Sequence, residues 1–160
     1  MATRLNYIKA APKAYQAMSQ LEHYVKNCGL EASLIELVKI HASQINGCAY
    51  CIDMHTKDAR ANGESEQRIY LLSAWREVPF YNERERAALE WTEALTMITD
   101  NHVPDEIYEH VKPHFTDEEL VNLSVTVATI NAWNRLAISL RSEVGSYQPK
   151  HTITHREASA

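Results

Sequence analysis

The chain has 160 residues with 45% hydrophobic content, which is enough for one domain with its own core. A formal net charge of −5, with Lys and Arg spread along the chain, gives no reason to expect a nucleic-acid partner. No apolar run approaches the roughly 18 residues of a membrane span, so we expect no membrane partner.

With only 4 Gly and 5 Pro, the composition favours an all-α protein. Hydrophobic spacing and capping signals predict seven helices and no strand. The first is expected over about 12–27, the second over 33–46 and the third over 48–62. Between the second and third, Gly47 can adopt the left-handed conformation that ends a helix.

The second half of the chain continues the helical pattern. A short fourth helix is expected over 65–77, before a Val-Pro step that disfavours helix. Asn-x-x-Glu and Thr-x-x-Glu capping boxes predict helices over 82–95 and 116–140, with a short helix after Pro104 between them. We assign residues 1–145 to one domain and residues 146–160 to a polar C-terminal tail.

Cys48 and Cys51 lie at the predicted start of the third helix, with His55 one turn further on. Residues three or four apart share a helix face, so these three side chains are expected to form one stripe. The helix N-terminus favours a thiolate at Cys48, whereas His55 at i+4 favours Cys51. Which thiol reacts first is left open by this spacing.

The short connection at Gly47 predicts that the helices on either side pack antiparallel as a hairpin. Glu36 and His55 each lie about ten residues from this turn, or roughly 15 Å of helix, so they are expected to meet. A carboxylate there orients the imidazole, which can then take a thiol proton. The sequence therefore predicts a catalytic site for thiol chemistry.

Other interpretations of the cysteine pair are less well supported. A zinc site needs two ligands in addition to the cysteine pair, and His23 or His41 could contribute only if the fold brought them next to the thiols. A c-type haem needs His directly after the second cysteine, where this chain has Ile52, and a thioredoxin fold needs strands. We expect no cofactor and no metal, and the remaining alternative is a pair of inert buried thiols.

Compartment and context support redox chemistry. The N-terminus lacks the apolar segment of a secretory signal, so we expect a cytoplasmic protein, in which a Cys pair is more often reactive than structural. The third cysteine, Cys28, is expected to be a packing residue. Three tryptophans, Trp75, Trp91 and Trp133, are expected in the core or at a subunit interface.

The segment from Glu36 to His55 resembles the core motif of AhpD-like alkylhydroperoxidases, within the carboxymuconolactone decarboxylase superfamily. That motif is Glu, eleven residues, Cys-x-x-Cys, three residues and His, and the chain matches it at each position. Segments 70–76 and 130–135 are also similar to this family. The resemblance implies an all-α AhpD-like fold and a homo-oligomer such as a trimer or hexamer.

The resemblance also implies roles for the site residues. Cys51 is the peroxidatic thiol, which is oxidised to a sulfenic acid, and Cys48 resolves it into a Cys48–Cys51 disulfide. His55 and Glu36 form the proton relay. Tyr50 stands where the best-known members have a second histidine, and it is a secondary candidate that donates a hydrogen bond or packs at the pocket mouth.

Two functions are expected from these residues. The first is a thiol-dependent peroxidase in antioxidant defence, which reduces organic hydroperoxides or hydrogen peroxide and is recycled by a dithiol reductant such as a lipoylated protein. The second is a redox-responsive disulfide reductase or interaction protein without efficient peroxide turnover. The decarboxylase branch of the superfamily lacks the Cys pair, which argues against lactone decarboxylation.

Overall fold

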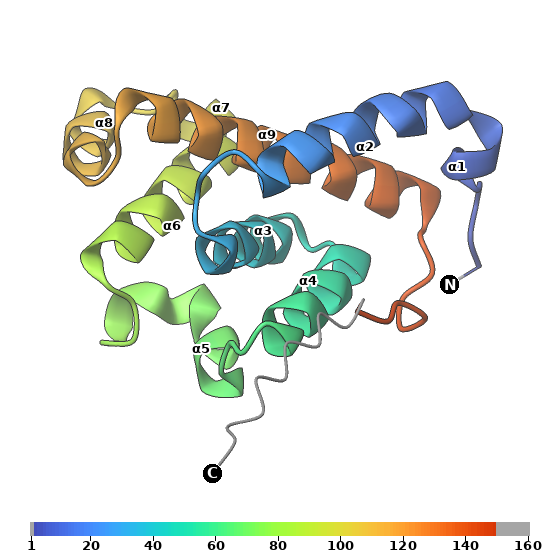
Figure 1. Ribbon diagram of the computed structural model, residues 1–160, viewed down its shortest axis with the longest axis horizontal. Coiled ribbons are helices and arrows are strands. Elements are labelled where there is room, and N and C mark those ends of the chain that lie inside the picture. Colours follow the sequence, from blue (N-terminus) through green and yellow to red (C-terminus); the bar gives the residue numbers. More distant parts are fainter. Residues whose placement is uncertain (1, 150–160) are drawn as a thin grey trace, which may run out of the picture.

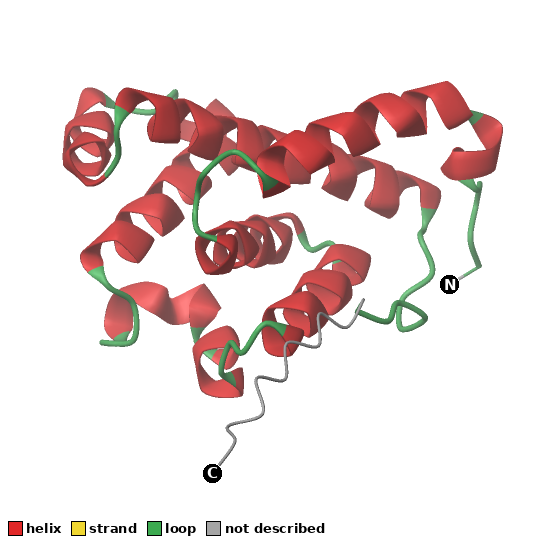
Figure 2. Cartoon of the chain, viewed as in Figure 1, coloured by secondary structure: helices red, strands yellow, loops and turns green. Residues whose placement is uncertain are grey.

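The computed structural model describes residues 2–149, and these residues form helices and loops without a strand (Figure 2). The predicted all-α class is therefore confirmed. None of the described helices is long and apolar enough to cross a membrane. The elements in chain order are α1 (Tyr7–Ala10), α2 (Pro12–Lys26), α3 (Ala32–Asn46), α4 (Ala49–Ala61), α5 (Glu66–Tyr70), the 3₁₀ helix η1 (Leu72–Glu77), α6 (Glu83–Thr96), α7 (Ile98–Asn101), α8 (Asp105–Val111), the 3₁₀ helix η2 (Lys112–His114) and α9 (Asp117–Leu140).

The long helices begin and end within one or two residues of the predicted positions. Both predicted capping boxes are present, at Asn82 for α6 and Thr116 for α9. The short elements were predicted less well: α1 and α7 were missed, and the helix expected over 65–77 divides into α5 and η1. Four-residue helices carry too little periodicity to be recognised. The Asn6 side chain, which accepts the Lys9 N–H, caps α1.

Helix α3 is the centre of the fold and packs against α4, α6 and α9 (Figure 1). Every residue over 34–43 is buried, including four polar ones. Buried polar groups need partners, so each of the four fixes α3 to another helix. The pairs are Glu36 with His55, Lys39 with Glu22, His41 with Glu93, and Ser43 with Asn134.

A tight turn joins α3 to α4. Gly47 has φ 68° and ψ 32°, the left-handed conformation that was expected there, and its N–H bonds back to α3. The Cys48 N–H donates to the Ser43 carbonyl at 2.9 Å, while further along the pair His55 meets Glu36. The antiparallel hairpin arrangement of α3 and α4 stays a prediction.

The chain after α9 lies along α4. The Gly145 N–H donates to Asp53 at 3.2 Å, and the Tyr147 hydroxyl donates to Asp58 at 2.7 Å. Lys57 donates to the Tyr147 carbonyl at 3.1 Å. The division into residues 1–145 and a tail stays a prediction, because residues 150–160 lie outside the described part of the chain.

Candidate active site

The two thiols lie at the start of α4 and beneath α9. Cys48 is the N-cap residue of α4, and its sulfur accepts the Cys51 N–H at 3.4 Å. Both side chains are 1% exposed and pack with Ala42 of α3 and with Ile130 and Ala137 of α9. Both cysteines are free thiols. The sequence predicted the position of the pair at a helix start. Its burial under α9 depends on the tertiary fold and was not predicted.

His55 and Glu36 meet as predicted. Their side chains are joined at 2.8 Å between Nδ1 of the imidazole and a carboxylate oxygen, and both residues are buried. Because Nδ1 is bonded to Glu36, Nε2 is the ring nitrogen of His55 that remains for proton exchange. His55 lies one turn after Cys51 on α4. The structure therefore brings together all four residues that the spacing selected.

Hydrogen bonding divides the charge unequally between the thiols. The Cys51 S–H and N–H both donate to the Cys48 sulfur, and together they outweigh burial and lower the pKa of Cys48 to about 7. The same S–H bond, together with burial, raises the pKa of Cys51. The reduced pair is therefore expected to lose its first proton near neutral pH, and these bonds favour the resulting negative charge on Cys48. The sequence analysis left open whether the helix N-terminus favours a thiolate at Cys48 or His55 favours one at Cys51. The lowered pKa of Cys48 agrees with the effect of the helix N-terminus.

An asparagine missed by the sequence analysis supports both thiols. Asn134 of α9 is fully buried one turn from Ile130, and the hydrogen-bonding influence of its side chain lowers the pKa of each thiol. Its Nδ2 also donates to Ser43 Oγ at 3.0 Å, and its carbonyl oxygen accepts from Asn46 at 2.9 Å. Asn134 is within the 130–135 segment that resembles the family, which was the available signal for it.

A cavity of about 320 Å³ opens beside Cys51 and His55. Cys51 lines it, whereas Cys48 is not among its lining residues, so Cys51 is the thiol that a small molecule in the cavity meets. Tyr50 also lines this cavity and packs on the thiol cluster, and burial raises the pKa of its phenol. Trp75 and Trp91 are buried, as expected, but Trp133 is half-buried and forms part of the cavity wall.

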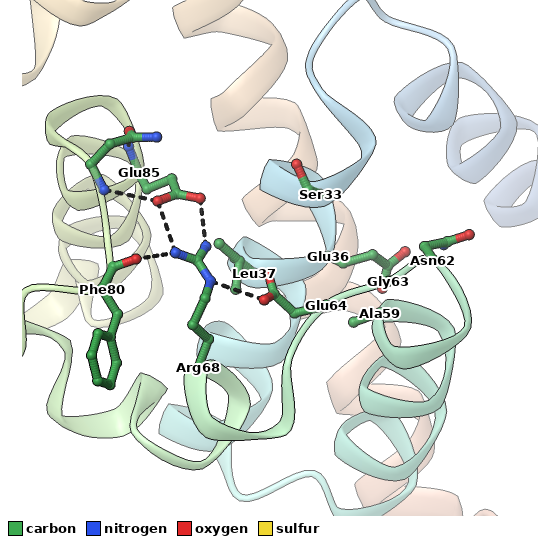
Figure 3. A pocket seen from close by; sticks show the side chains of 11 residues that line it. Ser33, Glu36, Leu37, Ala59, Asn62, Gly63, Glu64, Arg68, Phe80 and Glu85 are labelled. Atoms are coloured by element: carbon green, nitrogen blue, oxygen red, sulfur yellow. Dashed lines mark hydrogen bonds and ion pairs between the residues drawn. The ribbon is translucent and has the colours of Figure 1, made fainter.

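A second cavity, of about 440 Å³, is also lined by Glu36 (Figure 3). Arg68 in this cavity donates to Glu64 at 2.9 Å and to Glu85 at 2.6 Å, so its charge is already compensated (Figure 3). Glu36 lines this second cavity, while its partner His55 lines the cavity beside Cys51. The Glu36–His55 pair therefore stands between the two spaces.

One group of the described side chains has the geometry of a metal site. Ligand atoms of Glu36, His55 and Asp58 lie within 4.8 Å of one another. Hydrogen bonds already account for this geometry, because His55 bonds Glu36 and Asp58 accepts from Tyr147. His41, considered above as a zinc ligand, is bonded to Glu93 at 2.9 Å instead of lying with the thiols.

Comparison with known proteins agrees with this fold. The model of the carboxymuconolactone decarboxylase family matches residues 11–94. The uncharacterised protein YdfG of Bacillus subtilis is 45% identical over 146 residues, which cover 91% of this chain and 99% of YdfG. A crystal structure from Agrobacterium tumefaciens, of a protein of unknown function described as a candidate AhpD antioxidant defence protein, superposes with a TM-score of 0.88. It is 49% identical, over 91% of this chain and 100% of that one.

These similarities and the Glu-Cys-Cys-His site define an AhpD-like helical protein. The chain belongs to the carboxymuconolactone decarboxylase family. The same fold occurs in the debrominase Bmp8, with a TM-score of 0.75 at 19% identity, over 87% of this chain and 75% of that one. The fold is therefore shared with a debrominase.

Proposed function

We propose that this protein is a thiol-dependent peroxidase that reduces organic hydroperoxides or hydrogen peroxide through Cys51 and Cys48. The observation that carries the proposal is the arrangement of Cys51 and His55 on one cavity, with Cys48 directly beneath and Glu36 bonded to the imidazole. The similarity to a protein described as a candidate antioxidant defence protein AhpD supports the same conclusion. Antioxidant defence is the role that we propose for it.

The reaction begins with the two neutral thiols and neutral His55. One thiol proton passes to His55, and the remaining thiol proton moves within the pair to Cys48, which leaves the thiolate on Cys51. This thiolate attacks the terminal oxygen of the hydroperoxide, and the O–O bond breaks to give Cys51 sulfenic acid and an alkoxide. His55 returns its proton to the alkoxide, which leaves as an alcohol.

Cys48 then completes the oxidative half of the cycle. Its thiol sulfur attacks the sulfenic sulfur, a disulfide forms, and the hydroxyl leaves with the thiol proton as water. A dithiol reductant, such as a lipoylated protein, returns the pair to two thiols and becomes a disulfide itself. We extend the proposal to a cytoplasmic homo-oligomer, either a trimer or a hexamer.

Replacement of the attacking thiol tests the proposal. We expect Cys51→Ser to abolish hydroperoxide consumption in the presence of a dithiol. Cys28→Ser, at the half-buried third cysteine, is the matched control and retains it. The measurement is stopped-flow oxidation of the reduced protein, with mass spectrometry of the Cys48–Cys51 disulfide. Unchanged consumption in Cys51→Ser would refute the peroxidase.

A second function is favoured by the Cys48 thiol, whose pKa of about 7 suits thiol–disulfide exchange. In this alternative the protein is a redox-responsive disulfide reductase or interaction protein. Rapid exchange with a dithiol, alongside slow reaction with every peroxide, would support it over the peroxidase. Failure of both cysteines to react with a thiol reagent would reject both functions and indicate inert thiols.

A further inference from the structure

The cavity beside Cys51 and His55 is rich in aromatic side chains. Five aromatic side chains line its volume of about 320 Å³, at the compact end of the range for small-molecule pockets. They come from α1, α2, α4, α9 and the segment after α9, and are Tyr7, Tyr15, Tyr50, Trp133 and Tyr147.

Three of the rings form a packed cluster. The ring centroids lie 6.3 Å apart for Tyr7 and Tyr15, 6.4 Å for Tyr7 and Trp133, and 6.0 Å for Tyr15 and Trp133. These spacings are those of edge-on and tilted aromatic pairs, which present both ring faces and ring edges to a neighbour. An aromatic guest can add to such a cluster with the same geometry.

Tyr147 is held at the wall by its own hydrogen bond to Asp58. Burial raises the pKa of Tyr7, and burial together with the Asp58 bond raises that of Tyr147. These phenols therefore remain uncharged at neutral pH. The aromatic part of the wall therefore consists of neutral rings with a few polar hydroxyls.

The charged groups at this cavity are paired. Burial opposes ionisation of Glu22, but the Lys39 ammonium outweighs it and lowers the pKa of that carboxyl. Lys26, the lysine that lines the cavity, also approaches Glu22, at 3.9 Å. Among the described residues that line the cavity, the two carboxylates of Glu22 and Asp58 outnumber the single lysine, Lys26, so the cavity disfavours an anion.

The aromatic wall extends beyond the part of the chain that the family model matches. The match covers residues 11–94, which contain the cysteine pair, His55 and Glu36 together with Tyr15 and Tyr50 of the wall. Tyr7, Trp133 and Tyr147 lie outside that range. The reactive residues therefore lie within the matched range, whereas the wall combines side chains from inside and outside it.

We propose that this cavity selects uncharged hydroperoxides that carry a compact aromatic group. The inference rests on the proposed peroxidase function. The aromatic ring of the substrate packs against Tyr7, Tyr15 and Trp133, and its hydroperoxide group extends to Cys51 and His55. Binding of the non-reacting ring contributes to kcat/KM because it positions the O–O bond at the sulfur.

The test compares the rate constants for oxidation of the reduced protein by cumene hydroperoxide, tert-butyl hydroperoxide, hydrogen peroxide and a fatty-acid hydroperoxide. Each is divided by the rate constant for the same peroxide with a free thiol, which removes intrinsic reactivity. We expect cumene hydroperoxide to exceed tert-butyl hydroperoxide by roughly tenfold or more, because it replaces a methyl group with a ring that the cavity can contact. The fatty-acid hydroperoxide, which is an anion, is expected to be slower than cumene hydroperoxide.

Variants locate the preference in the cavity wall. Tyr7→Leu combined with Tyr15→Leu should lower the cumene to tert-butyl ratio by roughly three- to tenfold. Tyr15→Phe, which keeps the ring, should retain the ratio. Tyr70→Leu changes a tyrosine that is 65% exposed and outside this cavity, and it is the matched control for loss of a tyrosine.

The outcomes distinguish failure of the aromatic selectivity from failure of the proposed peroxidase function. If no peroxide oxidises Cys51, the peroxidase itself fails. If hydrogen peroxide oxidises Cys51 but the normalised ratio of cumene to tert-butyl hydroperoxide is near one, the peroxidase stands and the aromatic selectivity is overturned. A ratio that survives the double leucine variant, or a faster reaction with the fatty-acid hydroperoxide, overturns it as well.

Discussion

Two histidine–glutamate pairs extend from α3, and they have similar bond lengths but different surroundings. Glu36 of α3 bonds His55 at 2.8 Å, and His41 of α3 bonds Glu93 of α6 at 2.9 Å. All four residues come from helices that the sequence predicted. From the residue types alone, either pair would serve as a proton relay.

Their surroundings distinguish them. Glu93 accepts from Trp75 at 2.9 Å and is bridged to Arg76, so both of its oxygens are engaged in addition to His41. Burial opposes its ionisation, but the bonds from His41, Trp75 and Arg76 prevail and lower its pKa to about 2. His55, by contrast, lines a cavity together with a thiol. The comparison teaches that access and a reacting neighbour, more than the pair itself, define a catalytic relay.

The largest expected effect is on the rate of Cys51 oxidation when each of the two histidines is replaced. His55→Gln can keep the bond to Glu36 but cannot carry a proton, so the rate of Cys51 oxidation should fall by about 10²- to 10⁴-fold. His41→Gln, the matched change, should keep its bond to Glu93 and leave the rate within about twofold. Stopped-flow kinetics of reduced protein with a hydroperoxide measures both. Equal losses in the two variants would show that the pairs do not differ in function.

The second prediction concerns stability at the other pair. The pKa of Glu93 in the folded protein, about 2, is below its ordinary value of 4.5, so ionisation stabilises the fold above pH 4.5 and this gain is lost as the pH falls toward 2. Glu93→Gln should therefore cost about 3 kcal/mol at pH 7, with a smaller difference from the wild type in acid. Urea unfolding across this pH range measures it.

A change on the same helix provides the control for that measurement. Glu90 pairs with His110, whose side chain is 59% exposed, so Glu90→Gln should cost less than about 1 kcal/mol. If Glu93→Gln is no more destabilising than Glu90→Gln, the pair at His41 is not a structural anchor.

The smallest expected effect is on the pH midpoint at which the cysteine pair ionises. Thiolate absorbance should titrate with a midpoint near pH 7 in the reduced wild type, with the thiolate present above that pH, and this step should vanish in Cys48→Ser. Asn134→Leu removes an amide donor and should raise the midpoint by less than about one pH unit. Asn131→Leu is the control, because Asn131 belongs to the same amide network through Asn46. An unchanged midpoint in Asn134→Leu would remove this residue from the site.

The site could be predicted from the sequence to the extent that it depends on local geometry. Cys48, Cys51 and His55 share one helix face, and a short turn brings Glu36 to them, so spacing alone was sufficient. Asn134 lies more than eighty residues further along the chain, and no local pattern links it to the thiols. Its position depends on how α9 crosses α3 and α4, which is a matter of packing.

The sequence by itself determined the long helices, their capping boxes and the meeting of the four residues of the candidate site, because helix periodicity and capping chemistry act between neighbours in the chain. Only the tertiary structure decided which thiol faces a cavity, which histidine pair is an anchor, and which aromatic side chains line the cavity wall. Tyr7, Trp133 and Tyr147 are brought together from the two ends of the chain. These three side chains come together because the helices pack around the buried α3. Long-range contacts specify that packing, whereas the spacing of residues in the sequence does not.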